Sequence, residues 1–424
     1  MSKSSFICVL ATAAAMLAAT TQAFVLPTSR LLGTSSLKMM AAGTTQAGEK
    51  KALTVADVKT RLIEKITSDP NMKLPDQFQQ ALTDILDGMT EVAENTGLDP
   101  EKYQEMLGLL MKEAAENSRS LYQFEPFHKN IRGPVDFTAF GENFFDILCV
   151  KEQSGVLGRK NMAKIVDYVR QGHNVVLLAN HQTEPDPYIL RSAFKRLVPA
   201  DDPLLDRLVF VAGAKVRTDL FTIPFSKGLN LICIHSKKYI EDDPATKPLK
   251  TQENLAAMKA LQGLIVEGGH ILWVAPSGGR DRTDVHTGKM AVAPFDSRAV
   301  DMFRVLSTKS QHPTHFFPLS MLTAQVLPPP AKVAMEVGER RLVARRPVHV
   351  YFGDELTPER VGSEFVARKM KDGTAEGLTE EELMKKAGKE GFTYVAEGDV
   401  KRHYDVLMGL DLVLEEEEVS VQYH

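Results

Sequence analysis

The chain has 424 residues, which is enough for two domains or for one large domain with an appendage. Hydrophobic residues make up 43% and charged residues 25% of it, the composition of an ordinary globular protein. The formal net charge of -4 gives no electrostatic reason to expect a nucleic-acid partner. The three cysteines lack metal-ligand spacing, and two of them, Cys149 and Cys233, are expected to be buried and reduced.

Residues 1–48 are interpreted as a two-part targeting leader. An apolar run from Phe6 to Ala19 is too short for a permanent membrane-spanning helix. After the Ala23-Phe24 junction the chain carries Ser, Thr, Arg and Lys, and its first acidic residue is Glu49. A signal peptide followed by a transit peptide resembles the bipartite leader of secondary plastids in diatoms and related algae; plain secretion is the alternative. No later run is apolar over about 18 residues, so the mature chain is expected to be soluble.

Residues 49–120 are predicted to form a small antiparallel bundle of three amphipathic helices. Thr54 is placed to cap the first helix, with Asp57 three residues later, and Gly97 is placed to end the second. Asp99-Pro100 begins the third. The apolar residues at helical spacing are interpreted as core: Val55, Val58, Leu62 and Ile66; Phe78, Leu82, Ile85, Met89 and Val92; and Tyr103, Met106, Leu107, Leu110 and Met111.

From residue 121 to 410 short apolar runs alternate with stretches of helix length, such as Asn254 to Ile265. This alternation predicts an α/β fold: a mixed, largely parallel sheet flanked by helices, preceded by the helical bundle. The expected strands are Asn174 to Asn180, Leu208 to Ala214, Leu229 to His235, His270 to Pro276, His315 to Met321, and two more between Ala331 and Gly353 around a turn at Gly338-Glu339-Arg340. Residues 411–424 are expected to be an acidic tail without chemistry. In such sheets the working residues collect where strands end.

The first candidate for chemistry is the run Asn180-His181-Gln182-Thr183-Glu184-Pro185-Asp186-Pro187, which follows a strand. Its two prolines exclude a helix that continues through this point and indicate a turn, which can bring the Asp186 carboxylate onto the His181 imidazole. A carboxylate that accepts from one ring nitrogen fixes the tautomer and raises the basicity of the other nitrogen. Such a histidine can take a proton from an alcohol near neutral pH. A strand-end histidine without function is the alternative interpretation.

The second candidate is the run Ala275-Pro276-Ser277-Gly278-Gly279-Arg280-Asp281-Arg282, which follows another strand. Glycines let the backbone approach a ligand closely, and guanidinium groups bind phosphate through paired hydrogen bonds. The alternative is a surface turn in which Arg280 or Arg282 pairs with Asp281 or Asp284. Ser277 is not expected to be a nucleophile, because the nucleophile elbow needs a glycine two residues before the serine, where this chain has an alanine.

Two further features are weaker. Between Arg207 and Ile240 six Lys or Arg residues face a single acid, Asp219, which favours an anionic partner; a solvated face is the alternative. The strand end Phe316 to Ser320 is apolar and would suit the wall of an acyl pocket. The six basic residues of this stretch are Arg207, Lys215, Arg217, Lys227, Lys237 and Lys238.

These blocks, in this order, resemble the glycerolipid acyltransferase superfamily, and more closely the soluble plastid glycerol-3-phosphate 1-O-acyltransferases. The resemblance covers roughly residues 50 to 410. It is carried by Asn180 to Glu184, by Val211-Ala212-Gly213 with the later Ser236-Lys237-Lys238, and most specifically by Ala275 to Arg282. The helical bundle also fits that soluble type.

The resemblance implies roles for individual residues. His181 would be the general base, Asp186 its partner, and Lys238, Arg280 and Arg282 the residues that hold the substrate phosphate. Two departures are visible: Tyr239 stands where the family usually has a phosphate-binding histidine, and Pro185 stands where a small residue is common. Tyrosine can still donate a hydrogen bond but adds no positive charge. Further candidates for substrate or carrier contacts are Lys215, Arg217, Lys237, Ser277, Gly278 and Gly279.

The resemblance also implies a reaction and its partners. Glycerol 3-phosphate would accept an acyl group from a thioester of acyl carrier protein or coenzyme A, a co-substrate, with no cofactor, no metal and no acyl-enzyme. Because acyl carrier proteins are acidic, the stretch from Lys215 to Lys238 is a candidate docking surface, and reversing Lys227 and Lys237 to Glu is expected to weaken the protein-borne donor alone. The expected location is the plastid stroma, with at most transient contact with a membrane surface.

Two other functions remain open at this point. A lysophosphatidate acyltransferase would share the His181 and Arg280 blocks, but its acceptor carries an acyl chain, so it normally sits at a membrane. A lipid- or carrier-binding module that has lost activity would be expected to lack His181 or Asp186, and both are present.

Overall fold

The computed structural model describes residues 53–236, 240–241, 244–284, 286–330, 340–375 and 377–422, the last twelve of these as backbone only. The expected leader and the first of the two strands expected after Ala331 lie outside the described residues, as do Lys237, Lys238 and Tyr239. The second of those strands is present as β9 (His349–Phe352).

The three N-terminal helices form as predicted. They are α1 (Val55–Ser68), α2 (Gln79–Thr96) and α3 (Pro100–Arg119), and α1 packs on both of the others. Thr54 and Asp57 make a capping box, Gly97 ends α2 with a left-handed φ of 64°, and the Asp99 side chain caps the amides of α3. The predicted core positions are buried, except that Met106 is only partly so.

A seven-stranded sheet forms the centre of the remaining chain. Its order is β1 (Gly155–Leu157), β9, β8 (Thr314–Leu322), β2 (Asn174–Ala179), β5 (Ile271–Val274), β3 (Leu208–Gly213) and β4 (Asn230–Ile234). Every neighbouring pair is parallel except β8 and β9, which are antiparallel. The predicted mixed, largely parallel sheet is therefore confirmed. A separate two-stranded ribbon pairs β6 (Arg282–Thr283) with β7 (Met290–Ala291).

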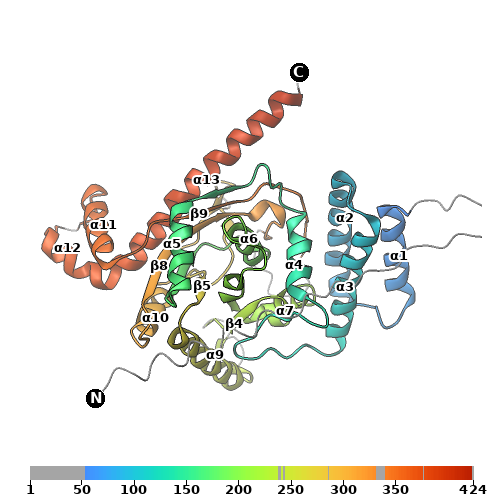
Figure 1. Cartoon of the computed structure of the whole chain (residues 1–424), viewed down its shortest axis with the longest axis horizontal. Helices are drawn as coiled ribbons and strands as arrows, with labels where there is room; N and C mark the ends of the chain where they lie inside the picture. Colours follow the sequence, from blue (N-terminus) through green and yellow to red (C-terminus); the bar gives the residue numbers. More distant parts are fainter. Residues whose placement is uncertain are drawn as a thin grey trace, which may run out of the picture. The chain divides into compact units, whose positions relative to one another are not determined.

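Helices cover both faces of the sheet (Figure 1). One apolar core lies under α4 (Phe137–Asp146), α5 (Arg159–Arg170), α6 (Asp186–Phe194) and α7 (Ile223–Lys227), and the other under α9 (Lys247–Glu267), α10 (Ser297–Ser307), α11 (Pro358–Lys371), α12 (Glu380–Lys386) and α13 (Phe392–Gln422). Strand β2 is buried on both sides because its side chains alternate: Val175 and Leu177 enter the first core, Val176 and Leu178 the second.

Short turns connect these elements. They are the 3-10 turns Asp76–Phe78, Pro203–Arg207, Ala214–Arg217 and Ala324–Val326 and the π turn Ala387–Gly391. Helix α13 runs along β8 and β9, as its red ribbon shows in Figure 1. No described helix is both long enough and apolar enough to cross a membrane. Cys233 is buried and Cys149 half-buried, and burial raises the pKa of each thiol to about 12, which fits inert cysteines.

Candidate active site

The candidate residues gather at one edge of the sheet, beyond the carboxyl ends of three adjacent strands. Strand β2 lies between β5 and β8 and is parallel to both, so the segments that follow these strands emerge side by side. Asn180 and His181 follow β2, the Ser277 to Arg282 segment follows β5, and Thr323 follows β8. The sheet order thus brings together residues that are more than 100 positions apart in sequence.

His181 and Asp186 are in direct contact, as the sequence predicts. His181 Nδ1 lies 2.7 Å from Asp186 Oδ2. The Asp186 side chain is fully buried, whereas 23% of the His181 side chain is exposed. The Trp273 ring packs edge-on against the imidazole, with ring centroids 5.2 Å apart. The imidazole is therefore held by a carboxylate at one nitrogen and still reachable from outside.

The local structure of this turn differs from the prediction in one respect. Asp186 is not inside the turn but is the first residue of α6, and Pro185 precedes the helix. Pro187 does not prevent this helix, because proline is tolerated in the first turn, where its missing N–H would have no intrahelical partner. The backbone amides of Gln182 and Thr183 donate to Asp186 Oδ2 at 2.7 and 3.2 Å, which closes the turn on the carboxylate.

Thr323 and Tyr404, which the sequence analysis did not single out, make further hydrogen bonds to the turn that holds His181 and Asp186. Thr323 Oγ1 donates to Asp186 Oδ1 at 2.5 Å. Gln182 Oε1 accepts from the Thr323 and Ala324 amides at 2.8 and 3.2 Å, and Gln182 Nε2 donates to the Tyr404 hydroxyl of α13 at 3.0 Å. No local pattern marks Thr323, since it becomes relevant only through the pairing of β8 with β2.

Asp281 joins the arginine-bearing segment to the histidine turn. Its amide donates to the His181 carbonyl oxygen at 2.5 Å. Its fully buried carboxylate accepts from Asn180 Nδ2 and from the Ala293 amide, both at 2.9 Å. Burial raises the pKa of Asp281 to about 6. The alternative in which Asp281 pairs with a neighbouring arginine on a surface turn is therefore wrong, because this carboxylate faces inward.

Arg280 lies beside the histidine turn. Its Nη1 is 3.6 Å from Glu184 Oε1, and 15% of its side chain is exposed. Glu184 is also held by Arg341, through Nε and Nη2 at 3.1 Å each, and Arg341 Nη2 donates to Asp219 at 2.8 Å. Arg341 is 5% exposed at its side chain and was not predicted as part of the site. Arg282 is half-buried in the β6–β7 ribbon.

The glycine turn after β5 is exposed at Gly278 and Gly279. Gly278 has a φ of 72°, which a residue with a side chain adopts only with strain. Ser277 Oγ donates to the Gly279 carbonyl oxygen at 3.0 Å, so the serine hydroxyl contributes to the turn itself. Lys238 and Tyr239, the other proposed phosphate contacts, lie outside the described residues.

Three of the described cations of the basic stretch are paired with distant acids, and one of them is Lys227, which corrects the expectation that Lys227 contributes to a cationic docking surface. The Lys227 side chain is 12% exposed, with its Nζ 2.5 Å from Glu113 Oε2 and over the rings of Tyr122 and Phe137. Two more basic residues form ion pairs: Arg217 Nη2 lies 2.6 Å from Glu253 Oε2, and Arg207 Nη1 lies 3.2 Å from Glu267 Oε1. Lys215 is exposed in the 3-10 turn after β3. Lys237, the other lysine of the docking test, lies outside the described residues.

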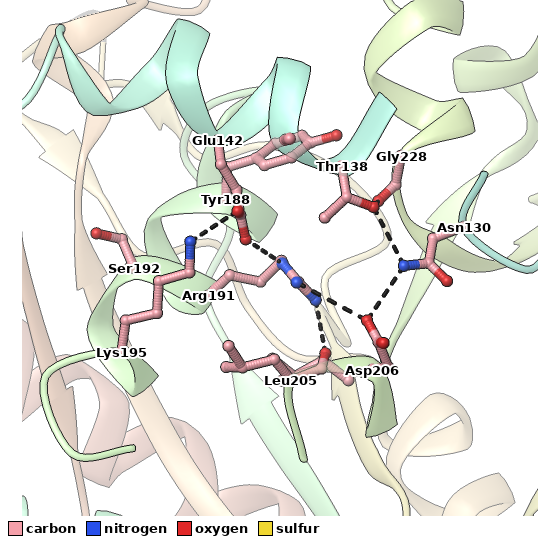
Figure 2. Close-up of polar contacts among 12 residues, drawn as sticks. Asn130, Thr138, Glu142, Tyr188, Arg191, Ser192, Lys195, Leu205, Asp206 and Gly228 are labelled. Atoms are coloured by element: carbon pink, nitrogen blue, oxygen red, sulfur yellow. Dashed lines mark hydrogen bonds and ion pairs between the residues drawn. The ribbon is translucent and has the colours of Figure 1, made fainter. Parts of the chain in front are cut away.

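Helix α6, which begins at Asp186, is anchored by a second polar network further along its length (Figure 2). Arg191 donates to Glu142 of α4 at 3.0 Å and to the Leu205 carbonyl oxygen at 2.5 Å. Lys195 Nζ reaches the same Glu142 carboxylate at 2.7 Å. The helix is thus fixed at both ends. Among the described residues no group of three or more His, Cys, Asp or Glu side chains is arranged to hold a metal ion.

Comparisons with known proteins relate the chain to acyltransferases. Residues 163–322 match the family described as Acyltransferase, a range that includes His181, Asp186, Arg280 and Arg282. The chain is 40% identical over 223 residues to the chloroplastic glycerol-3-phosphate acyltransferase of Arabidopsis thaliana, covering 52% of this chain and 48% of that protein. The like-named protein of Phaseolus vulgaris is 40% identical over 222 residues, with the same coverage. A third, the chloroplastic glycerol-3-phosphate acyltransferase ATS12 of Cucurbita moschata, is 38% identical over 242 residues, or 57% of this chain and 52% of that one. The chain thus spans about half the length of the curated relatives it matches.

Proposed function

We propose that this chain, whose residues 163–322 match the family described as Acyltransferase, transfers an acyl group from a carrier thioester to the 1-hydroxyl of glycerol 3-phosphate. The observation that carries the proposal is the His181–Asp186 contact beside a segment with two arginines, which Asp281 ties to the His181 carbonyl oxygen. The His181 imidazole can remove a proton and the arginines can bind a phosphate, and the two segments follow neighbouring strands of the sheet. The names of the relatives support glycerol 3-phosphate as the acceptor.

In the proposed mechanism His181 is the general base. Asp186 accepts from the Nδ1–H of the imidazole, so Nε2 carries the lone pair that takes the proton of the substrate hydroxyl. The hydroxyl oxygen then attacks the thioester carbonyl and forms a tetrahedral intermediate. When this collapses, the C–S bond breaks and the leaving thiolate takes the proton back from Nε2. The products are an acyl ester and a free thiol, and His181 returns to its neutral form.

Phosphate binding supplies the positioning of this reaction. Arg280 and Arg282 are proposed to hold the phosphate together with Lys238 and Tyr239, so that the far hydroxyl meets His181 Nε2. Fixing both reactants in this way can contribute about 7–11 kcal/mol to lowering the barrier. The leaving thiol is proposed to be the phosphopantetheine of acyl carrier protein or of coenzyme A. We further propose that the chain acts in the plastid, as the names of its relatives suggest, and in the stroma of a secondary plastid, as the leader composition suggests.

The test is an assay with glycerol 3-phosphate and a panel of acyl carriers, on the wild type and on His181→Ala. The variant should lose turnover by about 100-fold or more while it still binds glycerol 3-phosphate. His286→Ala is the matched control, because this side chain is exposed and the loss of an imidazole there should leave the rate unchanged. Substantial turnover by His181→Ala would overturn the assignment of the base. Preference for lysophosphatidate over glycerol 3-phosphate as acceptor would overturn the proposed substrate.

A further inference from the structure

We propose that Thr323 is a positioning residue of this site, whose hydroxyl fixes the Asp186 carboxylate in the orientation that serves His181. The inference rests on the proposed function, because it concerns how the proposed base is held. Thr323 follows β8, whereas His181 follows β2, so the contact crosses from one strand end to the next. Thr323 is 1% exposed and Asp186 0%, so the contact is shielded from solvent.

The hydrogen bonds of Asp186 are divided unequally between its two oxygens. Oδ2 accepts from His181 Nδ1 and from the Gln182 and Thr183 amides, at 2.7, 2.7 and 3.2 Å. Oδ1 accepts from Thr323 Oγ1 at 2.5 Å, the one donor to this oxygen that is found among the described residues. A buried carboxylate oxygen without a donor is costly, and such a carboxylate would rotate to find one. The Thr323 hydroxyl therefore locks the plane of the carboxylate and with it the direction of the bond to His181.

The backbone of Thr323 is itself held by a hydrogen bond, which keeps its hydroxyl pointed at Asp186. Its amide donates to Gln182 Oε1 at 2.8 Å, and Gln182 Nε2 donates to the Tyr404 hydroxyl at 3.0 Å. Gln182 is the residue directly after His181. One residue at the end of β8 thus supports both the partner of the proposed base and its immediate neighbour in the chain. Support of this kind, from groups that do not touch the substrate, is what keeps a catalytic side chain in productive geometry.

Thr323 makes no direct bond to the described residues proposed to serve the phosphate side of the site. Arg280 contacts Glu184, and Glu184 is held by Arg341, none of which is bonded to Thr323. Loss of the Thr323 hydroxyl should therefore lower kcat and leave the KM for glycerol 3-phosphate nearly unchanged. A general loss of structure would instead appear as a lower free energy of unfolding and a smaller folded fraction, with unchanged kcat for each folded molecule.

The experiment compares Thr323→Val, which keeps the shape and removes the donor, with Thr323→Ser, which keeps the donor. In Thr323→Val, kcat should fall about tenfold, with the KM for glycerol 3-phosphate within about twofold of the wild type. Thr323→Ser should keep kcat near the wild-type value. Thr90→Val is the matched control, because it removes a buried hydroxyl that bonds to the Leu86 carbonyl oxygen and Tyr103 in the N-terminal helices; it should lower stability without lowering kcat.

Three results would overturn the proposal: unchanged kcat in Thr323→Val, an equal loss in Thr323→Ser, or an equal loss in Thr90→Val. If Thr323→Val does not fold, Thr323→Ala takes its place, because it also removes the hydroxyl donor and does not put a methyl group where the hydroxyl was. A full rate in His181→Ala would refute the proposed function, whatever Thr323 does. Loss of activity in His181→Ala together with a full rate in Thr323→Val would refute only this inference.

Discussion

Removing the Arg341 guanidinium should weaken both the fold and the binding of glycerol 3-phosphate. Arg341 is buried between two carboxylates, with bonds of 3.1 Å to each oxygen of Glu184 and of 2.8 Å to Asp219. Arg341→Met leaves both acids without this partner in a buried site. The loss of one member of a buried ion pair typically costs about 3–5 kcal/mol, and that is the expected fall in the free energy of unfolding.

The effect on binding follows from the charge of Glu184. Its Oε1 lies 3.6 Å from Arg280 Nη1, and two unit charges at that distance attract by about 4–5 kcal/mol at an effective dielectric constant of 20. In the wild type the Glu184 carboxylate is paired with both Arg341 and Arg280. Without Arg341, the full negative charge of Glu184 attracts Arg280 and competes with the substrate phosphate for this guanidinium. If about 1.4 kcal/mol of additional attraction results, the KM for glycerol 3-phosphate rises about tenfold.

The assay measures kcat and KM for glycerol 3-phosphate at a temperature where circular dichroism shows the variant to be folded, and urea unfolding gives its stability. Arg340→Met is the matched control. It removes the same charge one residue away and takes a partner from buried Asp84 of α2, so it should also lose stability, but it should keep its KM because Asp84 lies in the N-terminal helices and not beside Arg280. A folded Arg341→Met variant with a wild-type KM would refute the reasoning.

Three further predictions concern stability. Because burial raises the pKa of Asp281 from 3.8 to about 6, the folded chain binds more protons than the unfolded chain between these values, so its stability falls as the pH rises through that interval. Asp281→Asn removes this titration, and the difference in urea-unfolding free energy between variant and wild type should shift by roughly 2 kcal/mol in favour of the variant from pH 4 to pH 7; a constant difference would contradict the assignment. Gly228→Ala should cost about 3 kcal/mol or more, because the new Cβ would lie 2.3 Å from a backbone carbonyl oxygen, whereas Gly263→Ala, with open space around it, should be neutral or slightly stabilising in the same measurement. Lys227→Glu should destabilise the fold by several kcal/mol, because the new carboxylate would repel buried Glu113. A stable variant with a higher apparent KM for acyl carrier protein alone would contradict this and support the docking surface that the sequence suggested.

The sequence predicted those features that depend on neighbours along the chain. The capping box at Thr54 and the left-handed end of α2 at Gly97 need residues within a few positions of one another, and both formed as expected. The same holds for the His181–Asp186 contact, which one short turn creates. The alternation of strands and helices also sufficed for the sheet type, because buried parallel strands have a recognisable apolar pattern.

The sequence could not predict the contacts that depend on the order of strands in the sheet. Thr323 meets Asp186 across 137 positions of the chain, and no local pattern distinguishes it from other buried threonines. The same distance effect misled the charge analysis. Lys227 belongs to a stretch with an excess of basic residues, but its partner Glu113 lies 114 positions earlier, so the local charge balance did not show that this lysine is already paired. The sequence left open a surface turn in which Asp281 pairs with an arginine, whereas in the structure Asp281 is buried and bonded to Asn180, which follows the neighbouring strand.

The bond from Gln182 to Tyr404 gives the last helix a part in shaping the turn that begins at His181. Val400 and Leu407 anchor this stretch of α13 in the second core, so Tyr404 presents its hydroxyl from a fixed position. Truncation of α13 from its carboxyl end should therefore affect the turn only when it reaches Tyr404. A protein that stops before Tyr404 loses the hydrogen bond to Gln182, so its activity should fall more than the loss of a few helical residues alone would explain.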